Sequence, residues 1–216
     1  MKFKTVVFDL DGTLLDTLDD LADSMNSVLE KHSYPIHEAD AYKYFIGNGL
    51  RNLVQMTFPE DKRDVENIDR GLSAMRKEYS IRWNNKTKPY KGIADMLNAL
   101  VDKGLRITVL SNKADDFTKL MVGKLLPEWD FELVFGERQG IPKKPDPAGA
   151  LEIAQKLGVQ PQDCLYLGDT GVDMKTAVSA GMYPVGVLWG FRKAEELVEN
   201  GARVIIAEPA AVLDLL

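Results

Sequence analysis

Hydrophobic residues between Leu18 and Tyr79 recur every three or four positions, and this spacing predicts amphipathic helices. The clearest stripe begins at Val65 and keeps its intervals of three and four up to Tyr79. Turn signals at Gly47–Gly49 and a break at Pro59 separate the repeats. The expected helices cover residues 18–29, 38–46, 50–56 and 65–79.

The rest of the chain alternates short apolar runs with helical repeats, which indicates right-handed βαβ units and a parallel sheet. The expected strands are Thr5–Phe8, Leu105–Leu110, Phe131–Phe135, Cys164–Leu167, Tyr183–Leu188 and Arg203–Ile206. The expected helices between them are Ile93–Leu100, Phe117–Leu126, Pro147–Leu157 and Met174–Ala180. We therefore expect an α/β fold, a Rossmann-like parallel sheet with helices on both faces. Its core domain would comprise residues 1–15 and 87–216, and an all-helical domain, residues 16–86, would be inserted after the first strand and act as a lid.

Composition and charge narrow the class of protein. The 216 residues are 45% hydrophobic and 28% charged, as in ordinary globular proteins. A net charge of -6 argues against broad nucleic-acid binding. Cys164 is the only cysteine, no apolar run has the length of a membrane span, and the first apolar stretch is too short for a signal peptide. We expect a cytoplasmic protein without membrane partners, either a monomer or a homodimer.

The first stretch with candidate chemistry is Thr5–Thr17, which reads TVVFDLDGTLLDT. A buried strand here ends in two carboxylates, Asp9 and Asp11, and Gly12 then allows a turn. Buried charges are costly unless they are paired or bound to a metal, so this pair points to a cation site. A simple polar turn after the strand is the alternative.

Two further stretches could hold an anion. Ser111 and Asn112 follow a strand and precede a helix, where a hydroxyl, an amide and backbone N–H groups can bind an anion. A helix N-cap is the alternative for this pair. Lys144 stands between Pro142 and Pro145, so its backbone is stiff and its direction defined. A solvated surface lysine is the alternative.

The fourth stretch, Gly168–Met174, reads GDTGVDM and follows another buried strand. Asp169 and Asp173 are four residues apart at a strand-to-helix turn, which suits a hard cation with oxygen ligands. A capping aspartate explains one of these acids but not both.

Taken together, DLDGTLLDT, SNK, KPDP and GDTGVDM resemble, in order, the four motifs of the haloacid dehalogenase (HAD) superfamily of phosphoryl-transfer enzymes. The resemblance implies that Asp9 is the nucleophile and that Asp11 is the general acid and base. It also implies that Thr13 positions Asp11 by a hydrogen bond. In the same family pattern the helical insertion is a cap domain.

The resemblance further implies ligands for Mg²⁺ and for a phosphoryl group. The metal would be held by Asp9, the backbone carbonyl of Asp11 and Asp169, with Asp173 supporting the metal shell directly or through water. The phosphoryl group would be held by Ser111, Asn112 and Lys144.

Within the superfamily the chain most resembles bacterial phosphoglycolate phosphatase-like enzymes, through GNGLRNLV at Gly47–Val54 and VGVLWGFR at Val185–Arg192. That implies a small phosphorylated metabolite, 2-phosphoglycolate, as substrate. Gly49 and Arg51 of the cap are candidates for selecting it, because the glycine allows close approach and the guanidinium can pair with a carboxylate. The alternative is that GNG only joins two helices and that Arg51 is solvated.

Other reactions stay open at this point. Pyrophosphatases and sugar-phosphate phosphatases share most of these motifs, and a β-phosphoglucomutase-like isomerase would transfer the phosphoryl group between sugar hydroxyls. In a different class, response-regulator receivers combine an acidic site with a phosphorylated aspartate, a Ser/Thr and a Lys-Pro. They are about half as long and phosphorylate an aspartate on the third strand, whereas the candidate here, Asp9, follows the first.

Overall fold

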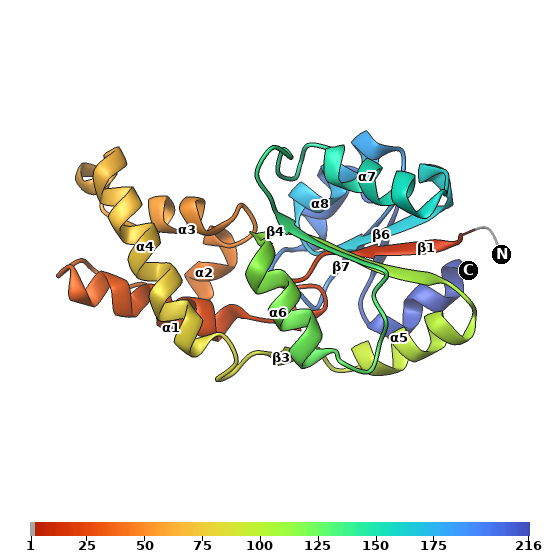
Figure 1. The fold of residues 1–216 in the computed structure, drawn as a ribbon, viewed down its shortest axis with the longest axis horizontal. Helices are drawn as coiled ribbons and strands as arrows, with labels where there is room; N and C mark the ends of the chain where they lie inside the picture. Colours follow the sequence, from red (N-terminus) through yellow and green to blue (C-terminus); the bar gives the residue numbers. More distant parts are fainter. Residues whose placement is uncertain (1–2) are drawn as a thin grey trace. The chain divides into compact units, whose positions relative to one another are not determined.

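The computed structural model describes residues 3–216, which divide into two compact units (Figure 1). One, the core unit, consists of the chain up to Leu15 together with Pro89–Leu216, and the other, the helical unit, is Asp16–Lys88. The two crossings between the units lie in short strands, β2 (Leu15–Asp16) and β3 (Lys88–Pro89), which pair with each other. Among the described residues, no helix combines the length and the apolar character needed to cross a membrane.

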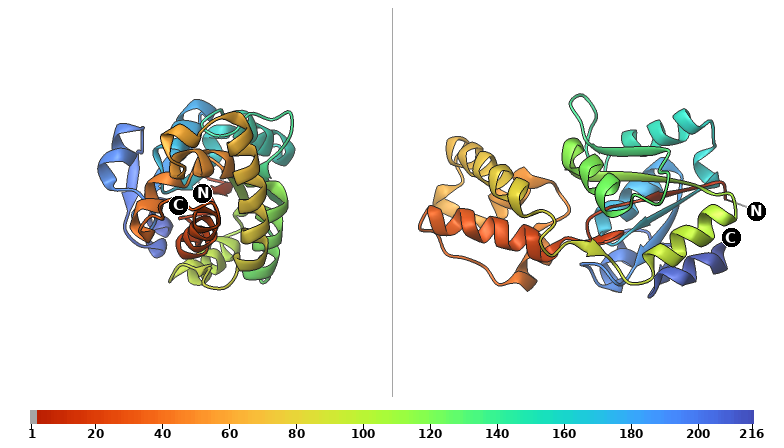
Figure 2. Two further views of the ribbon diagram at one scale, coloured as in Figure 1. Left: turned by 90° about the vertical axis from the view of Figure 1, so that its left-hand side faces the viewer. Right: turned by 60° about the horizontal axis from the view of Figure 1, so that its bottom comes forward.

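The helical unit contains the helices that the hydrophobic repeats predict. They are α1 (Leu18–Lys31), α2 (Ala39–Phe45), α3 (Leu50–Thr57) and α4 (Val65–Arg82), with a 3-10 turn, η1 (Glu60–Lys62), before α4. The apolar stripes face inward, so that Met25, Leu53 and Met75 are buried. Helices α1 and α4 lie against each other and form the long side of this unit (Figure 2).

Asp20 fixes the returning chain to the first helix of the same unit. Its side chain is 1% exposed, and its two oxygens accept hydrogen bonds from the backbone N–H of Lys86 at 3.0 and 3.1 Å. It also accepts from the backbone N–H and the hydroxyl of Thr87, at 2.8 and 2.7 Å. A buried carboxylate with this many donors holds the chain just before β3 in one conformation.

The core unit is built on a six-stranded parallel sheet with strand order β5-β4-β1-β6-β7-β8. Its strands are β1 (Thr5–Phe8), β4 (Arg106–Ala114), β5 (Leu133–Glu137), β6 (Cys164–Gly168), β7 (Tyr183–Val187) and β8 (Val204–Ile206). Its helices are α5 (Ile93–Asp102), α6 (Asp115–Leu125), α7 (Ala148–Leu157), α8 (Gly171–Ala180) and α9 (Ala194–Glu199), with 3-10 turns η2 (Pro161–Asp163) and η3 (Pro209–Leu215). Helices α7 and α8 cover one face of the sheet and α5 the other (Figure 1), which confirms the predicted Rossmann-like α/β fold.

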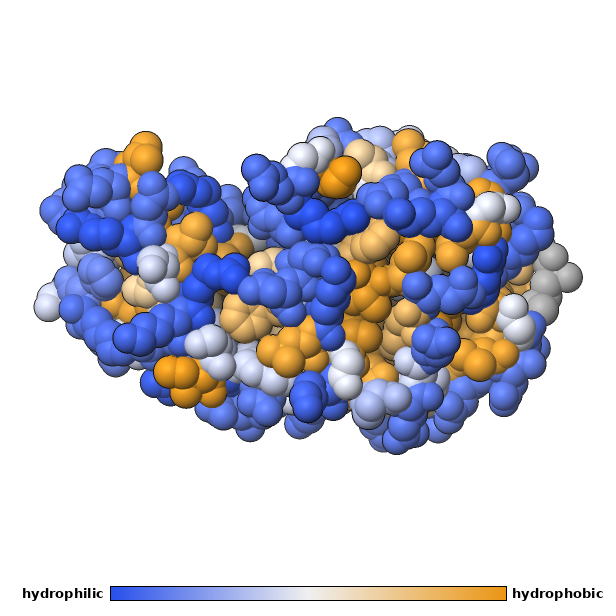
Figure 3. Space-filling model, in the orientation of Figure 1, coloured by the Kyte–Doolittle hydropathy of each residue, from blue (hydrophilic) through white to orange (hydrophobic). Residues whose placement is uncertain are grey.

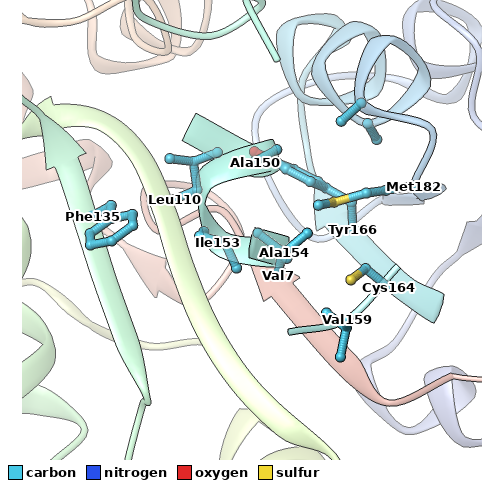
Figure 4. Packing of buried hydrophobic residues seen from close by; sticks show 12 residues of the cluster. Val7, Leu110, Phe135, Ala150, Ile153, Ala154, Val159, Cys164, Tyr166 and Met182 are labelled. Atoms are coloured by element: carbon cyan, nitrogen blue, oxygen red, sulfur yellow. The ribbon is translucent and has the colours of Figure 1, made fainter. Parts of the chain in front are cut away.

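The core beneath α7 and α8 is formed by inward-facing residues of four strands and these two helices (Figure 4). Val7 and Tyr166 come from adjacent central strands, and Ile153 packs on them from α7. Cys164 lies in the same cluster, and burial raises the pKa of its thiol to about 11. This cysteine is therefore a small core residue, not a nucleophile.

Two parts of the core unit differ from expectation. Strand β4 continues through Ser111 and Asn112 to Ala114 instead of ending at Leu110, because pairing with β5 resumes there after a register shift. Helix α9 has no predicted counterpart, since its six residues bury only Leu197 and carry too little periodicity to detect. On the face shown in Figure 3, hydrophobic side chains gather over the core unit between α6 and α5, while hydrophilic ones cover most of the helical unit.

The Asp20 contacts give a test of what holds the returning chain. We expect Asp20→Asn to lower the free energy of unfolding by about 2 kcal/mol, because the amide turns a donor toward buried N–H groups. Asp23→Asn is the matched control on the same helix, since its half-exposed carboxylate only meets Lys86 Nζ. Urea unfolding should show a change of less than about 0.5 kcal/mol for Asp23→Asn. Equal losses in the two variants would show that the Asp20 contacts are dispensable.

Candidate active site

The candidate site lies at the carboxyl ends of the two central strands, β1 and β6. From β1 the chain leads to β4 on one side, and from β6 it leads to β7 on the other side. Such a switch point leaves a crevice outside the strand ends, where ligands bind in open α/β sheets. Asp9 follows β1 and Asp169 follows β6, and the backbone N–H of Asp9 donates to the Leu167 carbonyl at 3.0 Å.

Three buried carboxylates gather there, from Asp9, Asp169 and Asp173, with one oxygen of each within 4.8 Å of the others. The Lys144 ammonium lies 2.9 Å from Asp9 Oδ1 and 2.7 Å from Asp173 Oδ1, and its side chain is 3% exposed. When all four groups are ionised, one positive charge faces three negative charges inside the protein.

The pKa values reflect this imbalance. Burial, and then the charge of Asp173, raise the pKa of Asp9 to about 7, and the opposing effect of Lys144 is too small to reverse them. Burial and the neighbouring carboxylates also raise the pKa of Asp169. Burial alone would lower the pKa of Lys144, but Asp173 and Asp9 outweigh it and raise that pKa. The charge of Lys144 alone is thus not enough to keep Asp9 ionised, and a hard divalent cation with oxygen ligands fits the remaining negative charge.

Asp173 is held in place by the start of helix α8. Its Oδ2 accepts hydrogen bonds from the backbone N–H and the hydroxyl of Thr170, at 3.1 and 2.6 Å, while Thr170 caps the helix in return. Its Oδ1 is the atom that meets Lys144. One carboxylate therefore performs the capping role and joins the charged cluster, so the two interpretations of this motif are compatible.

The turn after Asp9 depends on Gly12. Its φ is 87°, and a Cβ there would lie 2.2 Å from Asp169 Oδ2, so only glycine fits. The turn carries Thr13 against Asp169, and the Thr13 hydroxyl donates to Asp169 Oδ1 at 3.1 Å. The predicted hydrogen bond from Thr13 to Asp11 is therefore wrong, because the side chain of Asp11 leaves the turn in another direction.

Asp11 meets a cation that the motif pattern did not single out. Lys113 Nζ lies 2.9 and 3.1 Å from the two carboxylate oxygens of Asp11, with side chains 2% and 12% exposed. The Asp11 side chain thus lies outside the cluster of three carboxylates. The signal in the sequence was available, since Lys113 directly follows the Ser111-Asn112 pair at a strand end.

Ser111 and Asn112 are both 4% exposed and lie within β4, not after the end of this strand as expected. Ser111 Oγ accepts from the backbone N–H of Lys113 at 3.2 Å. The Asn112 amide donates to the Lys144 carbonyl at 3.0 Å and accepts from the Lys144 N–H at 2.9 Å. Asn112 therefore holds the backbone that presents Lys144, and its predicted contact to the phosphoryl group stays a prediction.

A loop after β7 contacts Asp169 and the turn at Gly12 and Thr13. The Trp189 indole N–H donates to the Thr13 carbonyl at 2.8 Å, and the Phe191 N–H donates to Asp169 Oδ2 at 2.9 Å. Gly190 lies between them, where a Cβ would be 2.3 Å from the Gly12 carbonyl oxygen and 2.4 Å from Asp169 Cβ. In the sequence these residues carry part of the family resemblance, through VGVLWGFR, but no role in the site was predicted for them.

The cap candidates Gly49 and Arg51 lie in the helical unit. Gly49 has a φ of 86° and precedes helix α3 as its N-cap residue. The Arg51 guanidinium forms an ion pair with Asp69 of α4, and both side chains are about half exposed. Arg51 is thus neither simply solvated nor buried.

Known proteins resemble this chain along nearly its whole length. A family model for haloacid dehalogenase-like hydrolases matches residues 6–187. The phosphoglycolate phosphatase of Pseudomonas putida is 30% identical over 97% of this chain and 78% of its own length, and that of Aquifex aeolicus is 32% identical over 91% and 90%. A crystal structure of a candidate phosphoglycolate phosphatase from Lactobacillus delbrueckii subsp. bulgaricus superposes with a TM-score of 0.93, at 30% identity, over 100% of this chain and 98% of that one.

The packing of Gly190 generates a prediction. Gly190→Ala should lower the free energy of unfolding by about 1 to 3 kcal/mol, because the added methyl group displaces Gly12 or Asp169. The matched control is Gly123→Ala in helix α6, where a Cβ meets nothing within 4 Å and alanine favours the helix. Denaturant unfolding of the two variants checks this. A Gly190→Ala protein as stable as Gly123→Ala would disprove the close packing.

Proposed function

The chain belongs to the haloacid dehalogenase-like hydrolases and is a phosphoric monoester hydrolase, and we propose that it is a Mg²⁺-dependent phosphatase acting through a phosphoaspartate on Asp9. The preferred substrate in this proposal is 2-phosphoglycolate. The hydrolase family disfavours the phosphoacceptor signalling module as an alternative.

One observation carries the proposal. Asp9 combines burial at a strand end, an ammonium at 2.9 Å and two further carboxylates within 4.8 Å. A nucleophilic carboxylate needs a positive charge near it, which also attracts the phosphoryl group, and it needs shielding from bulk water. Asp173 meets the same ammonium, but its other oxygen accepts two hydrogen bonds from Thr170, so we take Asp9, which follows the central strand β1, as the nucleophile.

The donor set suits the proposed metal. The clustered groups are carboxylates, which are the oxygen ligands that Mg²⁺ prefers, and their excess negative charge matches a divalent ion. We assign Asp9, Asp169 and the backbone carbonyl of Asp11 as its ligands, with Asp173 in support. When bound, Mg²⁺ would neutralise the carboxylates and draw electron density from the phosphoryl oxygens.

In the first chemical step a carboxylate oxygen of Asp9 attacks phosphorus. A new bond from this oxygen to phosphorus forms as the ester bond from phosphorus to the leaving oxygen breaks. Asp11 gives the leaving oxygen a proton, so that an alcohol departs. Lys144 balances negative charge around Asp9 during the transfer, and Ser111 is the proposed hydroxyl contact to the phosphoryl group.

In the second step water replaces Asp9 on phosphorus. Asp11, now ionised, takes a proton from the attacking water, and the bond between Asp9 and phosphorus breaks. Inorganic phosphate leaves, Asp9 is again a carboxylate, and Asp11 again holds its proton. The two steps together consume one water molecule and return every residue to its starting state.

The helical unit is proposed to act as a cap that selects the substrate. The core motifs hold only the phosphoryl group and the metal, so they cannot distinguish one monoester from another. The Arg51–Asp69 ion pair is solvent-exposed, and such pairs contribute about 0 to 1 kcal/mol. Arg51 can therefore exchange Asp69 for a substrate carboxylate at little cost, while Gly49 admits close approach of the backbone.

A panel of phosphorylated compounds tests both the activity and the substrate. With Mg²⁺ we expect 2-phosphoglycolate to give a higher kcat/KM than hexose phosphates or pyrophosphate. Arg51→Ala should lower kcat/KM for 2-phosphoglycolate by about 10-fold to 100-fold, the effect of losing a charged hydrogen bond. The same variant should barely change hydrolysis of p-nitrophenyl phosphate, which has no carboxylate.

Two controls accompany the panel. Arg70→Ala removes another exposed arginine of the helical unit and should not change kcat/KM for either 2-phosphoglycolate or p-nitrophenyl phosphate. Asp9→Asn should abolish hydrolysis of every compound while the protein remains folded. Retention of more than about a hundredth of the activity by Asp9→Asn would refute the covalent route. A higher kcat/KM for hexose phosphates or pyrophosphate would refute 2-phosphoglycolate as the preferred substrate but would not affect the proposed mechanism.

A further inference from the structure

Lys113 and Asp11 form an ion pair that the proposed chemistry leaves unexplained. Lys113 Nζ is 2.9 and 3.1 Å from the two oxygens of Asp11, and the lysine side chain is 2% exposed. A buried ammonium survives only where it is paired and hydrogen-bonded, so Asp11 satisfies a real electrostatic requirement. Lys113 belongs to the buried part of strand β4.

This pairing conflicts with the role of Asp11 toward the leaving group. Both of its oxygens are engaged by one ammonium, so neither is presented to a leaving oxygen. Asp11 can act only if something else takes over Lys113. Release of Asp11 takes a negative charge away from a buried ammonium, and an anion that takes the place of Asp11 restores that charge balance.

The substrate itself supplies an anion at the right place. Lys113 stands next to Ser111, whose Oγ accepts its backbone N–H at 3.2 Å, and Ser111 is the proposed phosphoryl contact. Lys144, the other buried ammonium of the site, is already divided between Asp9 and Asp173. A phosphoryl dianion bound beside Ser111 thus needs a further cation, and Lys113 is the one positioned to provide it.

We propose that Lys113 is a second phosphoryl-binding cation, which exchanges Asp11 for the phosphoryl group and so releases the Asp11 carboxylate, which takes up a proton from water and can then donate it to the leaving oxygen. The proposal rests on the phosphatase function proposed above. In this proposal Asp11 becomes available as the general acid only when substrate is bound. The competing explanation is a permanent structural pair in which Lys113 never touches the phosphoryl group.

Inorganic phosphate is a suitable probe, because it carries the recognised group and involves no turnover. Isothermal titration calorimetry in the presence of Mg²⁺ should show that Lys113→Met binds phosphate at least tenfold more weakly than the wild type. Lys119→Met removes an exposed lysine that pairs with Asp115 on helix α6, and should stay within twofold of the wild type. Phosphate affinity of Lys113→Met within twofold of the wild type would overturn the proposal.

A double-mutant cycle tests whether Asp11 and phosphate compete for Lys113, or whether removing a negative charge favours phosphate binding without Lys113. Asp11→Asn removes the carboxylate that competes for Lys113, so phosphate should bind several-fold more tightly than in the wild type. That gain should vanish when Lys113→Met is added, and a gain that persists in the double variant would refute the exchange. The double variant also leaves no unpaired charge, so its comparison with Asp11→Asn decides the matter even if Lys113→Met alone fails to fold.

Activity measurements distinguish failure of this proposal from failure of the phosphatase function. Wild-type protein is first assayed on p-nitrophenyl phosphate with Mg²⁺, and absence of hydrolysis there would count against the proposed function. Where the wild type is active, Lys113→Met should raise KM at least tenfold for this substrate. Lys113→Arg, which keeps the charge, should recover most of that loss. An active wild type with an unchanged KM in Lys113→Met would contradict the role of Lys113 alone.

Discussion

The structure depends on the sharing of one buried ammonium, that of Lys144, between Asp9 and Asp173. Without it, three carboxylates at the ends of β1 and β6 would repel one another inside the protein. Lys144 is itself held through its backbone by Asn112, and Asp173 is held by the cap of α8. The shared ammonium therefore links three segments of the chain, the residue after β1, the loop at Lys144 and the start of α8. The single positive charge of Lys144 does not balance the three carboxylates, and this excess of negative charge is the physical basis for proposing a divalent cation.

The fold supplies the precision that this charge cluster requires. Parallel pairing of β1 with β6 brings Asp9 and Asp169 to one edge of the sheet, and a close-packed core beneath α7 and α8 fixes those strands. Gly12 and Gly190 have no side chain, and the loops that contain them therefore approach Asp169 more closely than any other residue would allow. The helical insertion lies between β2 and β3 in the sequence and contributes none of the residues of the charged cluster.

Much of the fold could be predicted because long hydrophobic repeats and unbroken apolar runs have few interpretations. The stripe from Val65 to Tyr79 became α4, and the run before Asp9 became the central strand β1. Short elements with little to bury could not be found, and α9, with Leu197 as its buried residue, is the example. The extension of β4 past Leu110 arises from a register shift with β5, which no local pattern encodes.

Identities of site residues were easier to predict than their partners. Order along the chain pointed to Asp9, Lys144, Asp169 and Asp173, and the structure places these four together. The partner of Thr13 depends on how the turn at Gly12 is directed, and the pairing of Asp11 with Lys113 joins residues of two different strand ends. Such choices are made by tertiary geometry, so they appear only when the sheet is assembled.

The most direct test of this charge balance is the pH dependence of Mg²⁺ binding, measured by calorimetry on the wild-type protein. Because the pKa of Asp9 is raised from 3.8 to about 7, its proton stabilises the fold at low pH, and the metal-stripped protein should lose that stability as pH rises through 7. Mg²⁺ must displace the same proton, so its affinity should increase by about tenfold in total from pH 6 to pH 8 and level off at higher pH. Affinity that is independent of pH, with no proton release, would contradict the cluster as the metal site.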